Sequence, residues 1–124
     1  MKEVITLKAP AAIGPYSQAV LSGGFVFCSG QIPLDKDGNL VQGDIEGQAK
    51  QVMQNLKEVL ADAGSDISKA VKVTVYLSDM GDFPKLNEIY AQYFIGSVKP
   101  ARATVQVGRL PKDVKVEIDC MAEV

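Results

Sequence analysis

Residues 44–64 carry the strongest periodic pattern in the chain and set the first limit on its fold. Apolar residues recur there every three or four positions, with polar residues on the opposite side. Asp44 is placed to cap a helix N-terminus, Glu46 suits the positive end of the helix dipole, and Ala63-Gly64 provides a stop. The segment therefore predicts an amphipathic helix whose apolar stripe must pack against the rest of the chain. That stripe consists of Ala49, Val52, Met53, Leu56, Val59, Leu60 and Ala63.

Several other segments have the features of β-strands, and Val71–Leu77 alternates cleanly between apolar residues and longer, mostly polar ones. Strands are predicted at Val4–Leu7, Gln18–Leu21, Phe25–Ser29, Val71–Leu77, around Arg102 and at Val114–Ala122, the second and third forming a hairpin through Ser22-Gly23-Gly24. A second helix is predicted over Phe83–Phe94, with Asp82 as its cap and with Leu86, Ile89, Tyr90 and Tyr93 facing inward. The order β-β-β-α-β-α-β-β predicts an α+β fold, a two-layer sandwich in which two helices cover one face of a mixed β-sheet. Residues 1–124 are expected to form one domain.

The predicted sheet has one apolar and one semi-polar face. The apolar face, expected to lie under the helices, consists of Val71, Val73, Val75, Leu77, Val114, Val116, Ile118, Cys120 and Ala122. The other face is expected to carry Lys72, Thr74, Tyr76, Arg102, Thr104, Gln106, Lys115, Glu117 and Asp119. Such a face is either exposed to solvent or part of a semi-polar subunit interface, and the pattern leaves both interpretations open.

Composition excludes several classes of function. A net charge of −2 gives no support for general binding of DNA, RNA or an acidic membrane surface. The chain has no histidine, which removes the usual zinc sites and histidine-based catalysis, so that no metal is expected. No signal peptide or membrane span is expected. Cys28 and Cys120 lie far apart in two strand-like segments and are expected to be small buried hydrophobes in a reducing cytoplasm.

The segment Pro100-Ala101-Arg102-Ala103 indicates a site for a small anion. Pro100 fixes the entry of the chain into a strand, and the small neighbours leave room beside Arg102, whose planar guanidinium suits a carboxylate. A structural ion pair is the more common role for such an arginine. A hairpin-like pairing of the last two strands would bring Arg102 close to Glu117, either as a plain ion pair or as a substrate anchor beside a carboxylate that activates water.

Three further positions are candidate site residues. Ser29-Gly30 ends a strand, where Ser29 offers a hydroxyl and Gly30 permits close approach to the backbone. Tyr16 follows Gly14-Pro15 and is placed either to close a pocket or to anchor its loop. Asn87, in the second predicted helix, is a substrate-binding candidate, although a solvated or locally bonded amide is the more common role.

Several of these motifs, in this order, resemble the RidA family, also called YjgF/YER057c/UK114. The segments that carry the resemblance span nearly the whole chain: Ala11–Gln18, Ser29–Pro33, Pro100–Ala103 and Arg109–Ile118. The resemblance implies a chorismate-mutase-like fold and a homotrimer with sites in clefts between subunits. It also implies cofactor-free hydrolysis of 2-aminoacrylate/2-iminopropanoate and 2-iminobutanoate to 2-keto acids and ammonia.

The same resemblance implies roles for individual residues. Arg102 would bind the substrate carboxylate and Glu117 would position the attacking water, with Ser29, Tyr16 and the Gly30 backbone completing the pocket. Thr104 stands where many relatives have cysteine, so it would offer its backbone and a hydroxyl but no thiol chemistry. The alternatives are a trimeric module that binds small carboxylates or a protein partner without turnover, and a ribonuclease or translation inhibitor, as members of this family have also been described.

Overall fold

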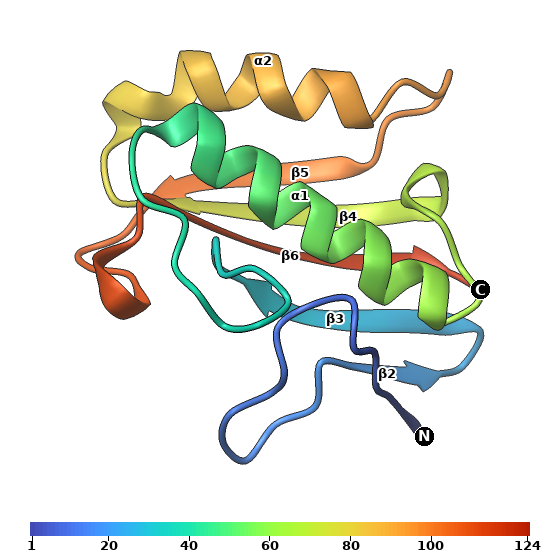
Figure 1. The fold of residues 1–124 in the computed structure, drawn as a ribbon. Helices are drawn as coiled ribbons and strands as arrows, with labels where there is room; N and C mark the ends of the chain where they lie inside the picture. The colour runs from blue at the N-terminus through green and yellow to red at the C-terminus, as the bar shows by residue number, and fades with distance from the viewer.

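A six-stranded sheet forms one layer of the structure, and two helices lie across one of its faces (Figure 1). The computed structural model describes residues 1–124. The strands are β1 Lys2–Val4, β2 Ala19–Ser22, β3 Phe25–Gln31, β4 Ala70–Leu77, β5 Ala101–Gln106 and β6 Val116–Glu123. The helices are α1 Ile45–Asp62 and α2 Phe83–Tyr93, with single 3₁₀ turns η1 Ile67–Lys69, η2 Met80–Asp82 and η3 Pro111–Asp113. The predicted α+β sandwich and its element order are confirmed.

The order of strands across the sheet is β1-β2-β3-β6-β4-β5. Every pair is antiparallel except β4 and β5, which are parallel and are connected through α2. A parallel pair needs a crossover of this kind, because the chain must return to the same end of the sheet. Strand β4 therefore separates β5 from β6, and the predicted hairpin-like pairing of the last two strands is wrong.

Helix α1 forms where the sequence predicts it. The Asp44 carboxylate accepts a hydrogen bond from the Gly47 N–H (3.3 Å), and Gly64 ends the helix with a left-handed φ of 78°. Its apolar stripe is buried against the sheet, with Met53 and Leu56 wholly inaccessible to solvent. Neither α1 nor α2 combines the length and the hydropathy that crossing a membrane requires.

Helix α2 begins at Phe83 after Asp82, as predicted, but without the expected capping hydrogen bond. Asp82 occupies the N-cap position, but its side chain makes no capping hydrogen bond. The turn η2 precedes it and is capped instead by Asp79, which accepts a hydrogen bond from the Gly81 N–H (2.8 Å). At the other end, Phe94 is buried while Tyr93 is only half-buried, so the inward stripe extends one residue beyond the helix.

The first and last strands are shifted from their predicted bounds. Strand β1 ends at Val4 because the chain then turns toward Gln18, whose side-chain oxygen accepts a hydrogen bond from the Thr6 N–H (2.8 Å). Strand β6 begins at Val116, although Val114 before it is buried as expected. A bulge near the start of β4 leaves Val71 half-buried.

The register of β5 corrects the predicted faces of the sheet. Arg102 pairs with Val73, which is buried under the helices, so Arg102 and Thr104 belong to the helix-covered face. Glu117 pairs with Tyr76 and belongs to the opposite face. The alternation within β5 was predicted correctly, but Arg102, Thr104 and Gln106 were assigned to the wrong side.

The two cysteines, which are distant in sequence, face each other across neighbouring strands in the structure. Cys28 of β3 lies opposite Cys120 of β6, and both are free and buried. Their mutual contact and their burial raise the pKa of the Cys120 thiol far above its usual value. The thiol therefore stays protonated, as expected for a core residue.

Candidate functional site

The guanidinium of Arg102 is held at the edge of the sheet without a carboxylate partner. Its Nη1 donates a hydrogen bond to the side-chain oxygen of Asn87 (2.7 Å), and its Cζ lies 4.7 Å from the centre of the Tyr90 ring and 5.4 Å from that of Phe83. None of the four ion pairs in the chain, which are Lys36–Asp37, Lys50–Glu46, Lys85–Glu88 and Arg109–Asp113, includes Arg102. The alternative of a structural ion pair within the chain is therefore excluded.

This arrangement follows from the packing of α2 against β5. Asn87 and Tyr90 are one turn apart on α2, so both side chains reach the same arginine. Aromatic rings and a neutral amide orient the guanidinium but leave its charge uncompensated, with further N–H groups free to bind an anion. A cavity of about 460 Å³ opens at this point, lined by Asn87, Tyr90, Ala91, Phe94, Lys99, Pro100 and Arg102.

Thr104 does not line this cavity. It follows Arg102 by two residues on the same face, but its hydroxyl is buried and has no hydrogen-bond partner. The hydroxyl of Tyr90 is also buried and unpartnered, and burial raises the pKa of that phenol. Both hydroxyls are thus closed off from solvent, although the residue Tyr90 itself lines the cavity.

The carboxylate of Glu117 lies on the other face of the sheet, against the backbone of Gly30. A Cβ atom added to Gly30 would collide with the carboxylate of Glu117, so the absence of a side chain at this position lets the two strands hold Glu117 in place. A cavity of about 380 Å³ lies beside them, lined by Tyr16, Ser29, Gly30, Ile32, Pro111 and Glu117. This surface brings together four of the site residues expected from sequence.

Two hydroxyl groups in this second cavity keep a donor or an acceptor that no residue of the chain uses. Ser29 donates its hydroxyl proton to the Ser17 carbonyl (2.6 Å), which leaves its oxygen able to accept. The Tyr16 oxygen accepts a hydrogen bond from the Ile13 N–H (3.4 Å), which leaves its own proton able to donate. The cavity therefore offers one acceptor, one donor and one carboxylate to a bound molecule.

Burial raises the pKa of the Glu117 carboxyl above its usual value, and the charge of Asp119 raises it further. Asp119 is itself fixed by the Tyr76 hydroxyl, which donates a hydrogen bond to it (3.1 Å). A carboxylate with a raised pKa is a better proton acceptor near neutral pH than an ordinary glutamate.

Apart from Thr104, the site residues expected from sequence thus fall into two groups within one chain. We call the group of Arg102 and Asn87 the arginine half-site, and the group of Tyr16, Ser29, Gly30 and Glu117 the glutamate half-site. Strand β4 lies between them and the two groups open on opposite faces of the sheet. Arg102 and Glu117 do not meet within one chain.

Two contributors to the arginine half-site were not predicted from sequence. Tyr90 was expected only as an inward residue of the second helix, and Phe83 only as its first residue, yet both rings contact the guanidinium. The signal that identifies them is the register of β5 beside β4, which no local pattern reveals.

Comparison with known proteins places the chain in a family. Residues 6–124 match the family model described as Endoribonuclease L-PSP. The chain belongs to this family. It is the RidA/YjgF family that the sequence motifs resemble.

Individual relatives cover almost the entire chain. A RutC family protein from Pyrococcus horikoshii is 56% identical over 98% of this chain and 98% of its own length. The 2-iminobutanoate/2-iminopropanoate deaminase of Mus musculus is 52% identical over 98% of this chain and 90% of its own length. Among solved structures, E. coli TdcF with bound serine superposes with a TM-score of 0.95 at 41% identity, covering 100% of this chain and 99% of that one. Deaminase names among the relatives support a deaminase function for this chain.

Proposed function

We propose that the protein hydrolyses reactive 2-enamine and 2-imine acids, such as 2-aminoacrylate/2-iminopropanoate and 2-iminobutanoate, to 2-keto acids and ammonia. The observation that carries this proposal is the uncompensated guanidinium of Arg102 at the wall of a cavity, oriented by Asn87 and Tyr90. The deaminase name of the mouse relative, 52% identical, supports the choice of reaction.

The active site of this proposal lies between subunits of a homotrimer. The arginine half-site and the glutamate half-site are on opposite faces of one chain, so a single chain cannot apply both to one small substrate. In a closed ring of identical subunits, the arginine half-site of one subunit faces the glutamate half-site of the next. Each interface then holds one complete site.

The chemistry needs no more than the groups that the two half-sites supply. The planar fork of Arg102 binds the substrate carboxylate and so fixes C2 of the imine. Glu117 accepts a proton from a water molecule as the water oxygen attacks C2, and the C=N electron pair moves to nitrogen, which takes up a proton. In the collapse of the resulting carbinolamine, the nitrogen takes up a further proton and the C–N bond breaks. The hydroxyl gives its proton to Glu117 as the C=O bond forms, and ammonia leaves. An enamine enters the same sequence after a proton adds at C3 to give the imine.

The remaining groups of the glutamate half-site orient the reactants. The Tyr16 hydroxyl can donate a hydrogen bond to the water oxygen as it becomes the carbonyl oxygen of the product. The Ser29 oxygen can accept a hydrogen bond from the imine N–H. Because the imine is already electrophilic, no covalent nucleophile is needed. The proposal includes a cytoplasmic location, which two facing free thiols fit.

A coupled assay tests the proposal. A pyridoxal-phosphate dehydratase generates 2-iminobutanoate from threonine at neutral pH, and the decay of the imine is followed with wild-type protein and with Arg102→Ala. We expect faster decay with the wild type alone, while both proteins keep the same oligomeric state by light scattering. Full activity of an intact Arg102→Ala oligomer would remove Arg102 from the mechanism.

A ribonuclease is the second candidate, because the matched family model carries the name of an endoribonuclease. The same preparations are therefore incubated with RNA. Cleavage that persists through purification and disappears in Arg102→Ala would favour this activity. Saturable binding of keto acids with neither imine hydrolysis nor RNA cleavage would instead favour a module that binds small carboxylates.

A further inference from the structure

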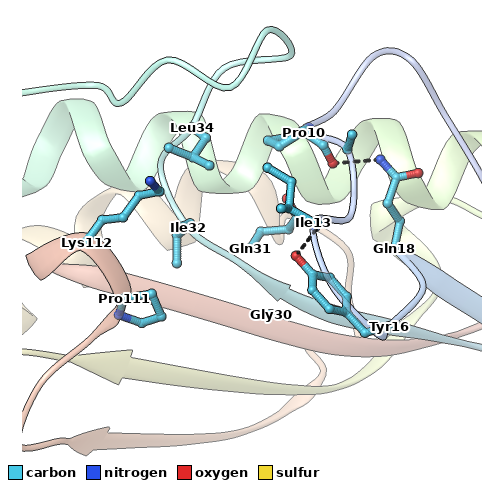
Figure 2. A pocket seen from close by; sticks show the side chains of 11 residues that line it. Pro10, Ile13, Tyr16, Gln18, Gly30, Gln31, Ile32, Leu34, Pro111 and Lys112 are labelled. Atoms are coloured by element: carbon cyan, nitrogen blue, oxygen red, sulfur yellow. Dashed lines mark hydrogen bonds between the residues drawn. The ribbon is translucent and has the colours of Figure 1, made fainter.

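A third cavity adjoins the glutamate half-site and is not used by the proposed reaction. It has a volume of about 310 Å³, within the range of small-ligand sites, and shares Tyr16, Gly30, Ile32 and Pro111 with the cavity beside Glu117 (Figure 2). Its further walls are largely apolar, including Pro10, Ile13 and Leu34. A substrate that is longer than 2-iminobutanoate would extend its side chain from the glutamate half-site into this space.

One largely buried polar side chain at this cavity, that of Gln31, makes no hydrogen bond within the chain. Gln31 is only 6% exposed, yet among the lining residues the drawn hydrogen bonds join Gln18 to Pro10 and Tyr16 to Ile13, and none reaches Gln31 (Figure 2). The contrast with Gln18 is informative, because that equally buried amide bonds to the backbone at Thr6 and Pro10. The only wholly buried unpartnered side-chain groups in the chain are the hydroxyls of Tyr90 and Thr104, so the Gln31 amide reaches the cavity and can both donate to and accept from a ligand.

A cation lies at the rim of the same cavity. Lys112 takes part in none of the four ion pairs of the chain, and it extends from η3 toward Leu34 (Figure 2). Its backbone is held in the left-handed region (φ 56°), as is that of Asp113 (φ 55°), and the Arg109 guanidinium binds the Asp113 carboxylate through two hydrogen bonds of 2.6 and 3.0 Å. Backbone strain of this kind persists only where surrounding contacts impose it, so Lys112 is placed by a fixed turn.

We infer that this cavity binds the side chain of the 2-imino acid and selects a side chain that ends in a carboxylate. This inference rests on the proposed function and specifies its substrate class. A terminal carboxylate would accept hydrogen bonds from the Gln31 amide and from the Lys112 ammonium, while its methylene groups contact the apolar walls. An apolar side chain of the same shape would fill the space but leave Gln31 dehydrated and unpaired.

Two product analogues of matched shape test this inference. The probes are 2-oxoglutarate and 5-methyl-2-oxohexanoate, which have equally long side chains that end in a carboxylate and in two methyl groups. Binding to the assembled protein is measured by titration calorimetry for the wild type, Gln31→Leu, Lys112→Gln and the control Lys57→Gln, a lysine exposed on α1. We expect the wild type and the control to prefer 2-oxoglutarate by about tenfold or more, and each cavity variant to lose about tenfold of its affinity for 2-oxoglutarate. Gln31→Leu is also expected to bind the branched probe more tightly than the wild type.

Hydrolysis of 2-iminobutanoate by the wild type is measured separately, because it tests the reaction and not the cavity. Hydrolysis together with equal affinities for both probes, or a preference that survives in both cavity variants, would overturn the selection of an acidic side chain and leave the deaminase in place. A preference that the variants abolish, without any imine hydrolysis, would support the acid-selective cavity and remove the deaminase.

Discussion

Subunit mixing provides the sharpest test of a site that is shared between chains. Arg102→Ala removes the guanidinium of the arginine half-site from a subunit, and Glu117→Gln removes the carboxylate that we propose as the general base of the glutamate half-site. Strand β4 separates the two half-sites within a chain, so in the proposed ring each site would take Arg102 from one subunit and Glu117 from its neighbour. Each variant alone therefore has no intact site, yet each carries the half that the other lacks.

The expected recovery follows from counting interfaces. In a random 1:1 mixture, half of the arginine half-sites and half of the glutamate half-sites are intact, so about one quarter of the interfaces regain a complete site. The variants are unfolded together, refolded together and assayed for decay of 2-iminobutanoate, and native mass spectrometry verifies the mixed composition. Mixing the folded proteins without exchange of subunits provides the baseline.

The double variant Arg102→Ala/Glu117→Gln, mixed 1:1 with wild type, provides a second reading of the same geometry. A site between subunits predicts about one quarter of wild-type activity for this mixture, whereas a site within one chain predicts about one half. An inactive mixture of the single variants, together with half activity in the second mixture, would refute the shared site.

Three further predictions concern single residues. Gly30→Ala places a Cβ against the Glu117 carboxylate and is expected to lower kcat by about 100-fold, as displacements near 1 Å do. The control Gly108→Ala, where a Cβ meets nothing within 4 Å, is expected to keep full activity in the same assay. Equal rates in the two variants would contradict the contact between Gly30 and Glu117. Asp119→Asn removes the like charge that raises the Glu117 pKa. Since the base must be ionised, the rate rises with pH through that pKa, and Asp119→Asn should move the acid limb of the kcat profile to lower pH. An unmoved limb would mean that the charge of Asp119 does not affect the pKa of Glu117. Tyr90→Phe removes a buried unpartnered hydroxyl but keeps the ring over the guanidinium, so urea unfolding should show a gain of up to about 1 kcal/mol, and a marked loss would mean that the hydroxyl has a partner in the assembled protein.

The parts of the fold that depend on local pattern were predictable from the sequence. Helix α1, with its cap at Asp44, and the β2–β3 hairpin follow from periodicity and turn residues, since both signals lie within a few positions of one another. The position of α2 and its N-cap residue Asp82 were also predictable, but the missing capping hydrogen bond was not, because the turn η2 ahead of the helix has its own capping aspartate.

The face to which Arg102 belongs was not predictable by the same means. Alternation within β5 separates two sets of side chains, but it does not tell which set the helices cover, because that depends on the neighbouring strand and on the register. The parallel pairing with β4, imposed by the crossover through α2, decides it. The same non-local choice separates Arg102 from Glu117 and brings Tyr90 and Phe83 to the guanidinium.

The facing pair Cys28 and Cys120 gives the protein a natural reporter of its own opening. Both thiols are buried between the sheet and the helices, and the raised pKa of Cys120 keeps it in the unreactive protonated form. An alkylating reagent can reach them only when the layer of helices moves away from this face of the sheet, so the rate of modification measures how often this part of the core opens. No label needs to be introduced, because these two are the only cysteines in the chain.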